Sequence, residues 1–306
     1  MRKRLIGIGL LAILFMVTSP SLGAVTEYNA EFVSGDLGIT IDGQPSDWVD
    51  IDKADVDLHP AVVGTGHYEA SVQAVWNDTH VAFMISVVDD YDFEDHNTGS
   101  HRNSSALGVL FVIDGDADAI RMGGTGDYAN ETSVGHVDIW HWELDEDYGV
   151  LSGGTEDDDA TNGGNDPDGN LDDEYSKHSE DRHDDDGTGA ENNLWGAYGH
   201  SGGTTAPAIG TAGTWYFEIM RTMTNGDVND VQFESGESYF MNLAYWDADE
   251  TGEQMGWTDD GHYVLETGAD AIVLSFNKPA SAPGFEIIVV IGSVIILATI
   301  VLKKRN

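Results

Sequence analysis

The stretch Val72-Gln-Ala-Val-Trp76-Asn77-Asp78-Thr-His-Val81-Ala-Phe-Met-Ile-Ser-Val-Val88 decides the fold class of this 306-residue chain. It contains two runs of β-branched, aromatic and small apolar residues, which Asn77 and Asp78 separate. Short apolar runs bounded by Gly, Asn and Asp are typical of β-strands, whereas helices need longer runs with a period of 3.6 residues. We therefore expect strands at 70–76 and 81–88.

The same strand pattern recurs along the chain. Further strands are predicted at 38–41, 106–113, 137–143, 214–220, 238–246 and 271–276. Short strands joined by loops predict an all-β fold, namely one antiparallel β-sandwich. Between 143 and 213 the composition turns to Asp, Glu, Gly and Asn. We expect this segment to be a long acidic loop insertion that contributes nothing to the core.

The N-terminus carries the marks of export. Residues 1–24 combine Arg2-Lys3-Arg4, an apolar run and a small-residue exit that ends at Ala24. This combination predicts a signal peptide cleaved after Ala24, because the apolar run is shorter than the ~20 residues that a membrane span needs. A retained N-terminal anchor is the alternative.

The C-terminus predicts a membrane anchor. Residues 287–302 are an unbroken run of apolar or small residues, and the basic tail 303–306 follows directly. A transmembrane helix with a cytoplasmic tail is the expected structure, since basic residues favour the cytoplasmic side. A linker at 277–286 precedes the helix. The sandwich domain, 25–276, is thus expected at the cell surface, outside the membrane.

The composition excludes several classes of function. The chain has 55 acidic and 13 basic residues, for a net charge of −42, and such a surface repels nucleic acid and anionic lipid. It has no cysteine, which excludes disulfides, thiolate metal sites and covalently attached haem. The H-E-x-x-H and G-x-S-x-G signatures of hydrolases are absent from the sequence, so we do not expect an enzyme.

One acidic segment has the spacing of calcium ligands. Asp166, Asp168, Asn170 and Asp172 stand at alternate positions around Gly169, as oxygen ligands do in a calcium loop. The bidentate Glu of an EF-hand is missing, because its position falls at Lys177. Two interpretations stay open, a structural calcium site and a solvated acidic loop.

The segment Trp140-His141-Trp142 has the alternation of a strand. Trp140 and Trp142 would share one face while His141 points to the other. The two tryptophans therefore form a broad aromatic surface. They either line a ligand pocket or fill the sandwich core.

Three stretches of the chain carry a resemblance to a known family. They are 39–48 with 72–90, 106–113 continuing through Met122 to Trp142, and 215–221 with 230–233 and 239–247. Together they resemble the haem-binding domain of ethylbenzene dehydrogenase gamma subunits and of related subunits of dimethyl-sulfoxide-reductase-type molybdenum enzymes. The Met122-Gly123, Trp-x-Trp and Glu-x-x-Arg features favour the haem-binding branch. The opening stretch is shared with sandwich domains such as family-nine carbohydrate-binding modules.

This resemblance implies a non-covalent b-type haem in a pocket of the sandwich, with a methionine and a lysine or histidine as axial ligands. Met122 matches the methionine, and Trp140 and Trp142 would form the pocket wall. The lysine that commonly follows the second tryptophan is replaced by Glu143. His262 is the nearest substitute as second ligand. The alternatives are His136, His141 and Met255.

The function implied by the resemblance is electron transfer between an extracytoplasmic redox partner and the membrane. The alternatives are a non-redox module of the same fold that binds carbohydrate or a surface-layer component, and a cation-dependent structural surface protein. The sequence Pro283-Gly284-Phe285 before the apolar run resembles the PGF-type sorting signals of archaeal surface proteins. That resemblance implies replacement of the helix by a lipid anchor.

Overall fold

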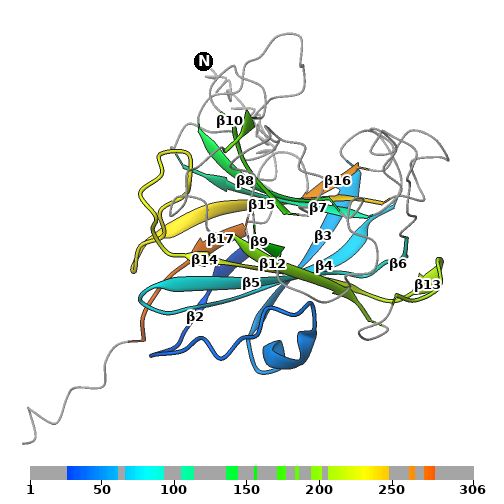
Figure 1. Cartoon of the computed structure of the whole chain (residues 1–306), viewed down its shortest axis with the longest axis horizontal. Coiled ribbons are helices and arrows are strands. Elements are labelled where there is room, and N and C mark those ends of the chain that lie inside the picture. The colour runs from blue at the N-terminus through cyan, green and yellow to red at the C-terminus, as the bar shows by residue number, and fades with distance from the viewer. Residues whose placement is uncertain are drawn as a thin grey trace, which may run out of the picture.

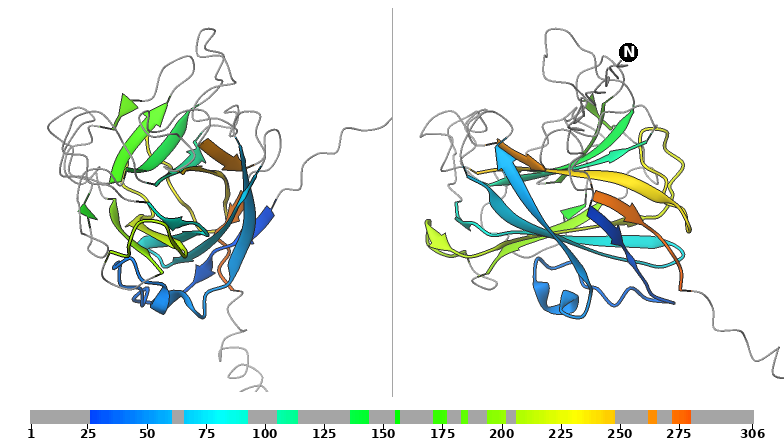
Figure 2. Two further views of the ribbon diagram at one scale, coloured as in Figure 1. Left: turned by 90° about the vertical axis from the view of Figure 1, so that its right-hand side faces the viewer. Right: turned by 180° about the vertical axis from the view of Figure 1, so that it is seen from behind.

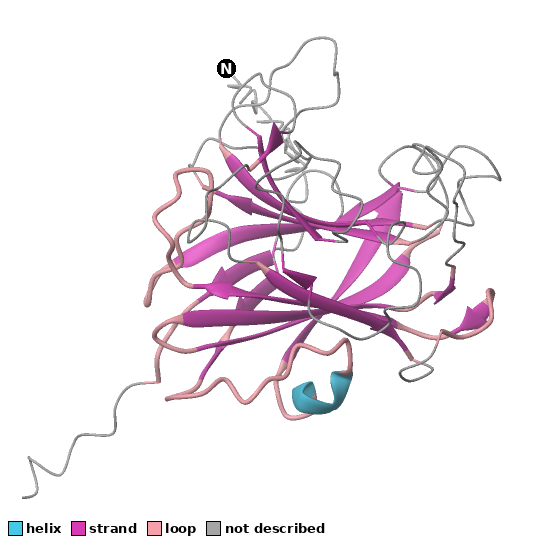
Figure 3. Ribbon diagram, viewed as in Figure 1, coloured by secondary structure: helices cyan, strands magenta, loops and turns pink. Residues whose placement is uncertain are grey.

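The computed structural model describes residues 26–60, 66–92, 105–113, 136–143, 155–156, 171–176, 183–185, 194–201, 206–247, 262–265 and 272–279. The elements are β1 (Thr26–Asn29), β2 (Glu31–Phe32), η1 (Pro45–Trp48), β3 (Lys53–Pro60), β4 (Tyr68–Trp76), β5 (His80–Val87), β6 (Asp90–Tyr91), β7 (Ala106–Val112), β8 (Val137–Glu143), β9 (Thr155–Glu156), β10 (Leu171–Ser176), β11 (His183–Asp184), β12 (Trp195–His200), β13 (Thr211–Ala212), β14 (Trp215–Thr222), β15 (Ser238–Trp246), β16 (His262–Leu265) and β17 (Ile272–Ser275). Strands account for nearly all of this regular structure (Figure 3).

Two layers of strands face each other (Figures 1 and 2). The upper layer of Figure 1 has the order β11-β10-β8-β7-β15-β16, and the lower layer has the order β4-β5-β14-β12-β9. β3 joins the layers at one side, because it pairs with both β16 and β4. Among the described pairs only β1 with β17 and β2 with β4 are parallel. The predicted all-β antiparallel sandwich is confirmed.

Aromatic side chains from both layers meet in the interior. Phe83 of β5 lies 5.6 Å from Trp140 of β8 between ring centroids, and Phe111 of β7 lies 4.7 Å from the same indole. All three side chains are fully buried. Each such side chain removes a large apolar surface from water, and truncation to Ala typically costs about 3–5 kcal/mol. This aromatic contact holds the two layers together.

The outer face of the lower layer is covered by the N-terminal segment. Glu218 of β14 accepts hydrogen bonds from the backbone N–H groups of Asp42 and Gly43, at 2.7 and 2.5 Å, and from the Trp48 indole at 2.6 Å. Gly43 has φ +70°, and a Cβ there would stand 2.2 Å from the Tyr198 carbonyl oxygen. A glycine is therefore required where the loop crosses β12. These contacts fix the segment onto the sheet.

Most of the predicted strands are present, with bounds that agree to within two residues. The segment 38–41 is an exception, because it forms no strand and packs Ile39 and Ile41 against the cluster around Trp48. The segment 143–213 is the larger correction. It contains β10 and β12, whose Leu171 and Tyr198 are buried in the core. The acidic residues around these short strands concealed their alternation.

Several predictions concern residues outside the described ranges. These are the signal peptide 1–24, the span 287–302, the sorting motif at 283–285, and most of the calcium loop. Within the described ranges, no helix has the length and apolarity that a membrane crossing requires.

Candidate functional site

Five neighbouring strands of the sheet turn a row of small and histidine residues away from the core. The backbone register aligns His141 of β8, Gly108 of β7, Ala244 of β15, Val264 of β16 and His59 of β3. Directly opposed residues of antiparallel strands point to the same side of a sheet. We call this side of β8, β7, β15, β16 and β3 the histidine face. The next row adds Trp246 and His262.

Trp246 is the centre of the histidine face. Its ring stacks on His262 with centroids 4.5 Å apart and planes inclined by 9°, and His141 lies 5.2 Å away on its other side along the strand order. The indole extends over Gly108, where an added Cβ would be 3.3 Å from the ring. Gly108 and the neighbouring Ala244 therefore give a low floor on which flat rings lie. His262 is the half-buried member of the stack.

His141 is accompanied by a carboxylate. Its Nδ1 lies 3.8 Å from Oε2 of Glu174, and both side chains are buried. Glu174 belongs to β10, inside the segment that the sequence predicted to be a loop. At this distance the two groups form an ion pair when the imidazole is protonated, but the two atoms do not share a hydrogen bond. The pair places polar groups beside the Trp246 stack.

A group of carboxylates lies where β15 ends. One carboxylate oxygen from each of Asp89, Asp92 and Asp247 lies within 4.8 Å of the others. Tyr245 donates a hydrogen bond of 2.5 Å to Asp89, and Tyr68 donates one to Asp247. Burial, together with the charge of Asp247, raises the pKa of Asp89 to about 7. Because Tyr245 points to the core side of β15, these acceptors lie on the side of the sheet opposite Trp246.

The three predicted haem-site residues on β8 point to opposite sides of that strand. Trp140 and Trp142 point into the sandwich core and are fully buried, whereas His141 points to the histidine face, as the alternation predicted. The structure therefore does not bring the two tryptophans to one pocket with His262. They fill the core instead, because the lower layer and Leu171 of β10 cover their rings.

The remaining predicted ligands are placed only in part. Met122, Met255, Asp166, Asp168 and Asn170 lie outside the described residues. Asp172 is described only through its backbone, which pairs with His141 on the histidine side. His136 is half-buried just before β8, with its ring 6.1 Å from Tyr175.

Trp246 and Glu174 were missed by sequence reasoning. A signal for Trp246 exists in the alternation Asn242, Ala244, Trp246 along β15, which places the indole beside small or polar neighbours and apart from the core residues Leu243 and Tyr245. No comparable signal exists for Glu174, since acidic residues surround it in the sequence.

No family model and no curated protein matches the chain. Two solved proteins are similar to it in structure. A proposed carbohydrate-binding protein of Bacteroides uniformis has a TM-score of 0.48 at 8% identity, covering 83% of this chain and 100% of that one. A family-nine carbohydrate-binding module of Caldicellulosiruptor kristjanssonii has a TM-score of 0.40 in complex with glucose (9% identity) and again in complex with cellotriose (11% identity). The glucose complex covers 85% of this chain and 100% of the module, and the cellotriose complex 84% and 99%. At this level of similarity the ligand of this chain has to be argued from its own residues.

Proposed function

We propose that this chain is a non-catalytic carbohydrate-binding module of the sandwich fold and that the histidine face is its binding site. The observation that carries the proposal is the parallel stack of Trp246 and His262, 4.5 Å apart, on a floor of small residues. Flat rings with an apolar body and a polar edge pack against the C–H face of a sugar ring. The similar solved structures include a module that binds glucose and cellotriose, the ligand class proposed here.

Polar groups around the stack are suited to sugar hydroxyls. His141 and Glu174 lie on one side of Trp246. Sugar sites combine an apolar ring platform with a few placed donors and acceptors. His262 is half-buried, so it is the part of the stack that a ligand would meet first.

The test is isothermal titration of the purified chain with glucose, cellotriose and a panel of other soluble oligosaccharides. We expect His262→Ala to weaken binding of the recognised sugar by about two- to tenfold, because ring stacking contributes about 0.5–1.5 kcal/mol. Trp195→Ala is the matched control, since Trp195 is a half-buried aromatic residue on β12, away from this face. Binding that is equal in His262→Ala and wild type, or absent for every sugar, overturns the proposal.

A b-type haem is the second candidate, and the His141–Glu174 pair favours it. Oriented imidazoles are common iron ligands, and a carboxylate partner strengthens them. Trp246 lies between His141 and His262, because its strand lies between the strands that carry the two histidines. The two imidazoles are thus separated by an indole, and the site fits one histidine ligand to the iron better than two. Haem, when bound, would supply one-electron transfer. His141 or His262 would hold the iron, and Trp246 would pack against the ring.

Spectroscopy separates the two candidates. Haemin titrated into the purified chain should give a sharp Soret band and, after reduction, the spectrum of a histidine-ligated b-type haem if the second candidate is right. His141→Ala and His262→Ala should each be measured, and a spectral change in only one of them identifies the ligand. A titration that leaves only the spectrum of free haemin excludes this candidate.

We further propose that the domain lies outside the membrane and is anchored there by the segment 287–302. The net charge of −42 supports an extracytoplasmic surface without nucleic acid or anionic lipid as partner. Protease treatment of intact cells should remove the domain while a cytoplasmic marker stays intact. Protection of the domain would contradict this location.

A further inference from the structure

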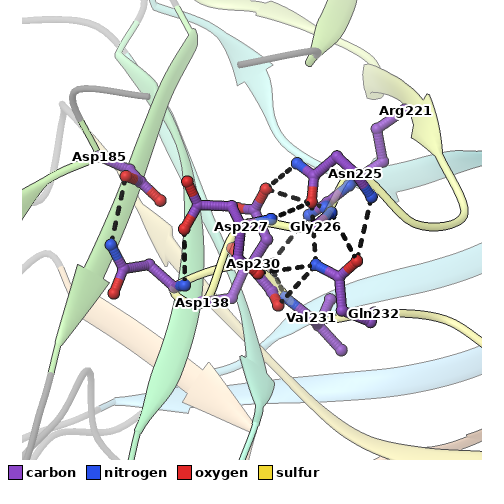
Figure 4. Close-up of polar contacts among 10 residues, drawn as sticks. Asp138, Asp185, Arg221, Asn225, Gly226, Asp227, Asp230, Val231 and Gln232 are labelled. Carbon is purple, nitrogen blue, oxygen red and sulfur yellow. Dashed lines mark hydrogen bonds and ion pairs between the residues drawn. The ribbon is translucent and has the colours of Figure 1, made fainter. Parts of the chain in front are cut away.

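A charged cluster is buried inside the sandwich. Its member on β8, Asp138, is three residues from His141 and points to the opposite side of the sheet from the histidine face. One carboxylate oxygen from each of Asp138, Asp173 and Asp230 lies within 4.8 Å of the others, and all three residues are buried. They come from β8, β10 and the loop after β14. Figure 4 shows Asp138 and Asp230 beside this loop, together with Arg221.

Arg221 of β14 is the cationic partner within the cluster. Its Nη1 donates a hydrogen bond of 3.0 Å to Oδ2 of Asp138, and its Nη2 lies 3.1 Å from Oδ2 of Asp230. Asp138 Oδ2 also accepts a hydrogen bond of 2.8 Å from the Val231 backbone. Arg221 therefore engages one oxygen of each of two carboxylates.

Arg221 does not engage the other oxygen, Oδ1, of these two carboxylates. Asp138 Oδ1 and Asp230 Oδ1 are buried and have no hydrogen-bond partner within the described ranges. Asp138 is completely inaccessible to water, and Asp230 is 2% exposed. A buried carboxylate oxygen without a donor is costly, since it has given up its hydrogen bonds to water. These oxygens are free to accept a cation.

The charges of the cluster do not balance. Three ionised carboxylates and one guanidinium leave a net charge of −2. Asp185 adds to this excess, because its charge also raises the pKa of Asp138. Burial and the neighbouring carboxylates raise the pKa of Asp138, although Arg221 opposes this. Either protons or a bound cation must compensate such a buried excess.

We infer that Asp138, Asp173 and Asp230 bind a divalent cation, and that calcium is the ion of best fit. Calcium takes six to eight oxygen ligands at about 2.3–2.6 Å, so oxygens on opposite sides of it stand about 5 Å apart. The spacing within 4.8 Å matches this sphere. Magnesium requires about 2.0–2.1 Å and keeps its waters, so the three carboxylates suit it less well.

The site lies next to the calcium loop predicted from the sequence but uses other residues. The loop ends at Asp172, whose backbone position belongs to the histidine side of β10, and Asp173 is the residue that faces the core. The other two ligands, Asp138 and Asp230, are 35 and 57 positions away from Asp173 in the sequence. An ion here would link β8, β10 and the loop after β14 inside the sandwich.

The first test is the thermal unfolding of the purified full chain after removal of metal with a chelating resin. Added CaCl2 should raise the midpoint by about 5–10 °C at a hundredfold excess over the dissociation constant, and MgCl2 should raise it less. Asp173→Asn should lower calcium affinity at least tenfold in isothermal titration. Asp168→Asn, in the predicted loop, is the matched control and should retain the affinity of wild type.

Three outcomes overturn the inference. They are a wild-type midpoint that does not respond to calcium, an Asp173→Asn variant that binds calcium as wild type does, and an Asp168→Asn variant that alone abolishes binding. The last result would place the ion in the loop. A calcium response combined with loss in Asp173→Asn supports the buried site. The sugar and haem experiments above are independent of this result.

A second measurement covers the case in which Asp173→Asn does not fold. Tb³⁺ replaces calcium at oxygen sites, and a nearby tryptophan sensitises its luminescence. Trp140 stands opposite Asp173 in the backbone register, and its ring lies 5.5 Å from the Arg221 guanidinium. Trp140→Phe should therefore remove at least half of the sensitised emission at equal Tb³⁺ occupancy. Unchanged emission would show that the ion binds elsewhere.

Discussion

Replacing Glu218 by Ala should weaken the attachment of the N-terminal segment to the outer face of the lower layer and so destabilise the fold. The carboxylate is buried and accepts hydrogen bonds from two backbone N–H groups, of Asp42 and Gly43, and from the Trp48 indole. Each buried donor that loses its acceptor costs about 1–3 kcal/mol. Asp42 is half-exposed, so its N–H can bond water instead. The Gly43 N–H and the Trp48 indole therefore account for most of the lost stability. We expect a decrease of about 3–5 kcal/mol in the free energy of unfolding.

Equilibrium unfolding in urea, followed by tryptophan fluorescence, measures this loss. Glu218→Gln should cost about 1–2 kcal/mol, because one amide oxygen remains as an acceptor. Glu237→Ala, at an exposed position, should stay within about 0.5 kcal/mol of wild type. A loss below about 1 kcal/mol in Glu218→Ala would refute the reasoning, since the three donors would then have found other partners without cost.

Three further predictions concern the same layers. Burial raises the pKa of Glu218 from 4.5 to about 7, so the folded chain holds this proton more tightly than the unfolded chain does. The stability that this proton binding adds is complete below pH 4.5 and is lost as the pH rises towards 7; urea unfolding of Glu218→Gln should lack this part of the pH dependence. Gly43→Ala should destabilise the fold by at least about 2 kcal/mol, because a Cβ would collide with the Tyr198 carbonyl in a left-handed conformation, and a shift below about 0.5 kcal/mol would contradict this. Gly196→Ala should cost about 1–3 kcal/mol, measured by thermal unfolding, since its Cβ would stand 2.2 Å from the Trp142 ring; an unchanged midpoint would show that the ring moves freely.

The strand pattern was readable from the sequence where apolar and aromatic residues are concentrated. The predicted bounds of 137–143 and 238–246 coincide with β8 and β15, because both segments are rich in such residues. The segment 143–213 could not be read in this way. β10 carries Asp172, Asp173 and Glu174 in succession, and such a run looks like a loop when its pairing with β8 is unknown.

The candidate site was predictable only in its local part. The sequence determined that Trp140 and Trp142 share one side of a strand and His141 the other, because side-chain direction alternates with every residue. It could not determine which side is the core. Only the tertiary structure covers the tryptophans with the second layer and brings His141 to Trp246 and His262.

The same division holds for the acidic residues. The sequence determined their excess and the net charge of −42. The tertiary structure decided which carboxylates leave water, since Asp138, Asp173 and Asp230 meet only when β8, β10 and the loop after β14 are packed together. Composition and periodicity are local properties of the chain, whereas burial and ligand geometry arise from strand pairings between distant segments.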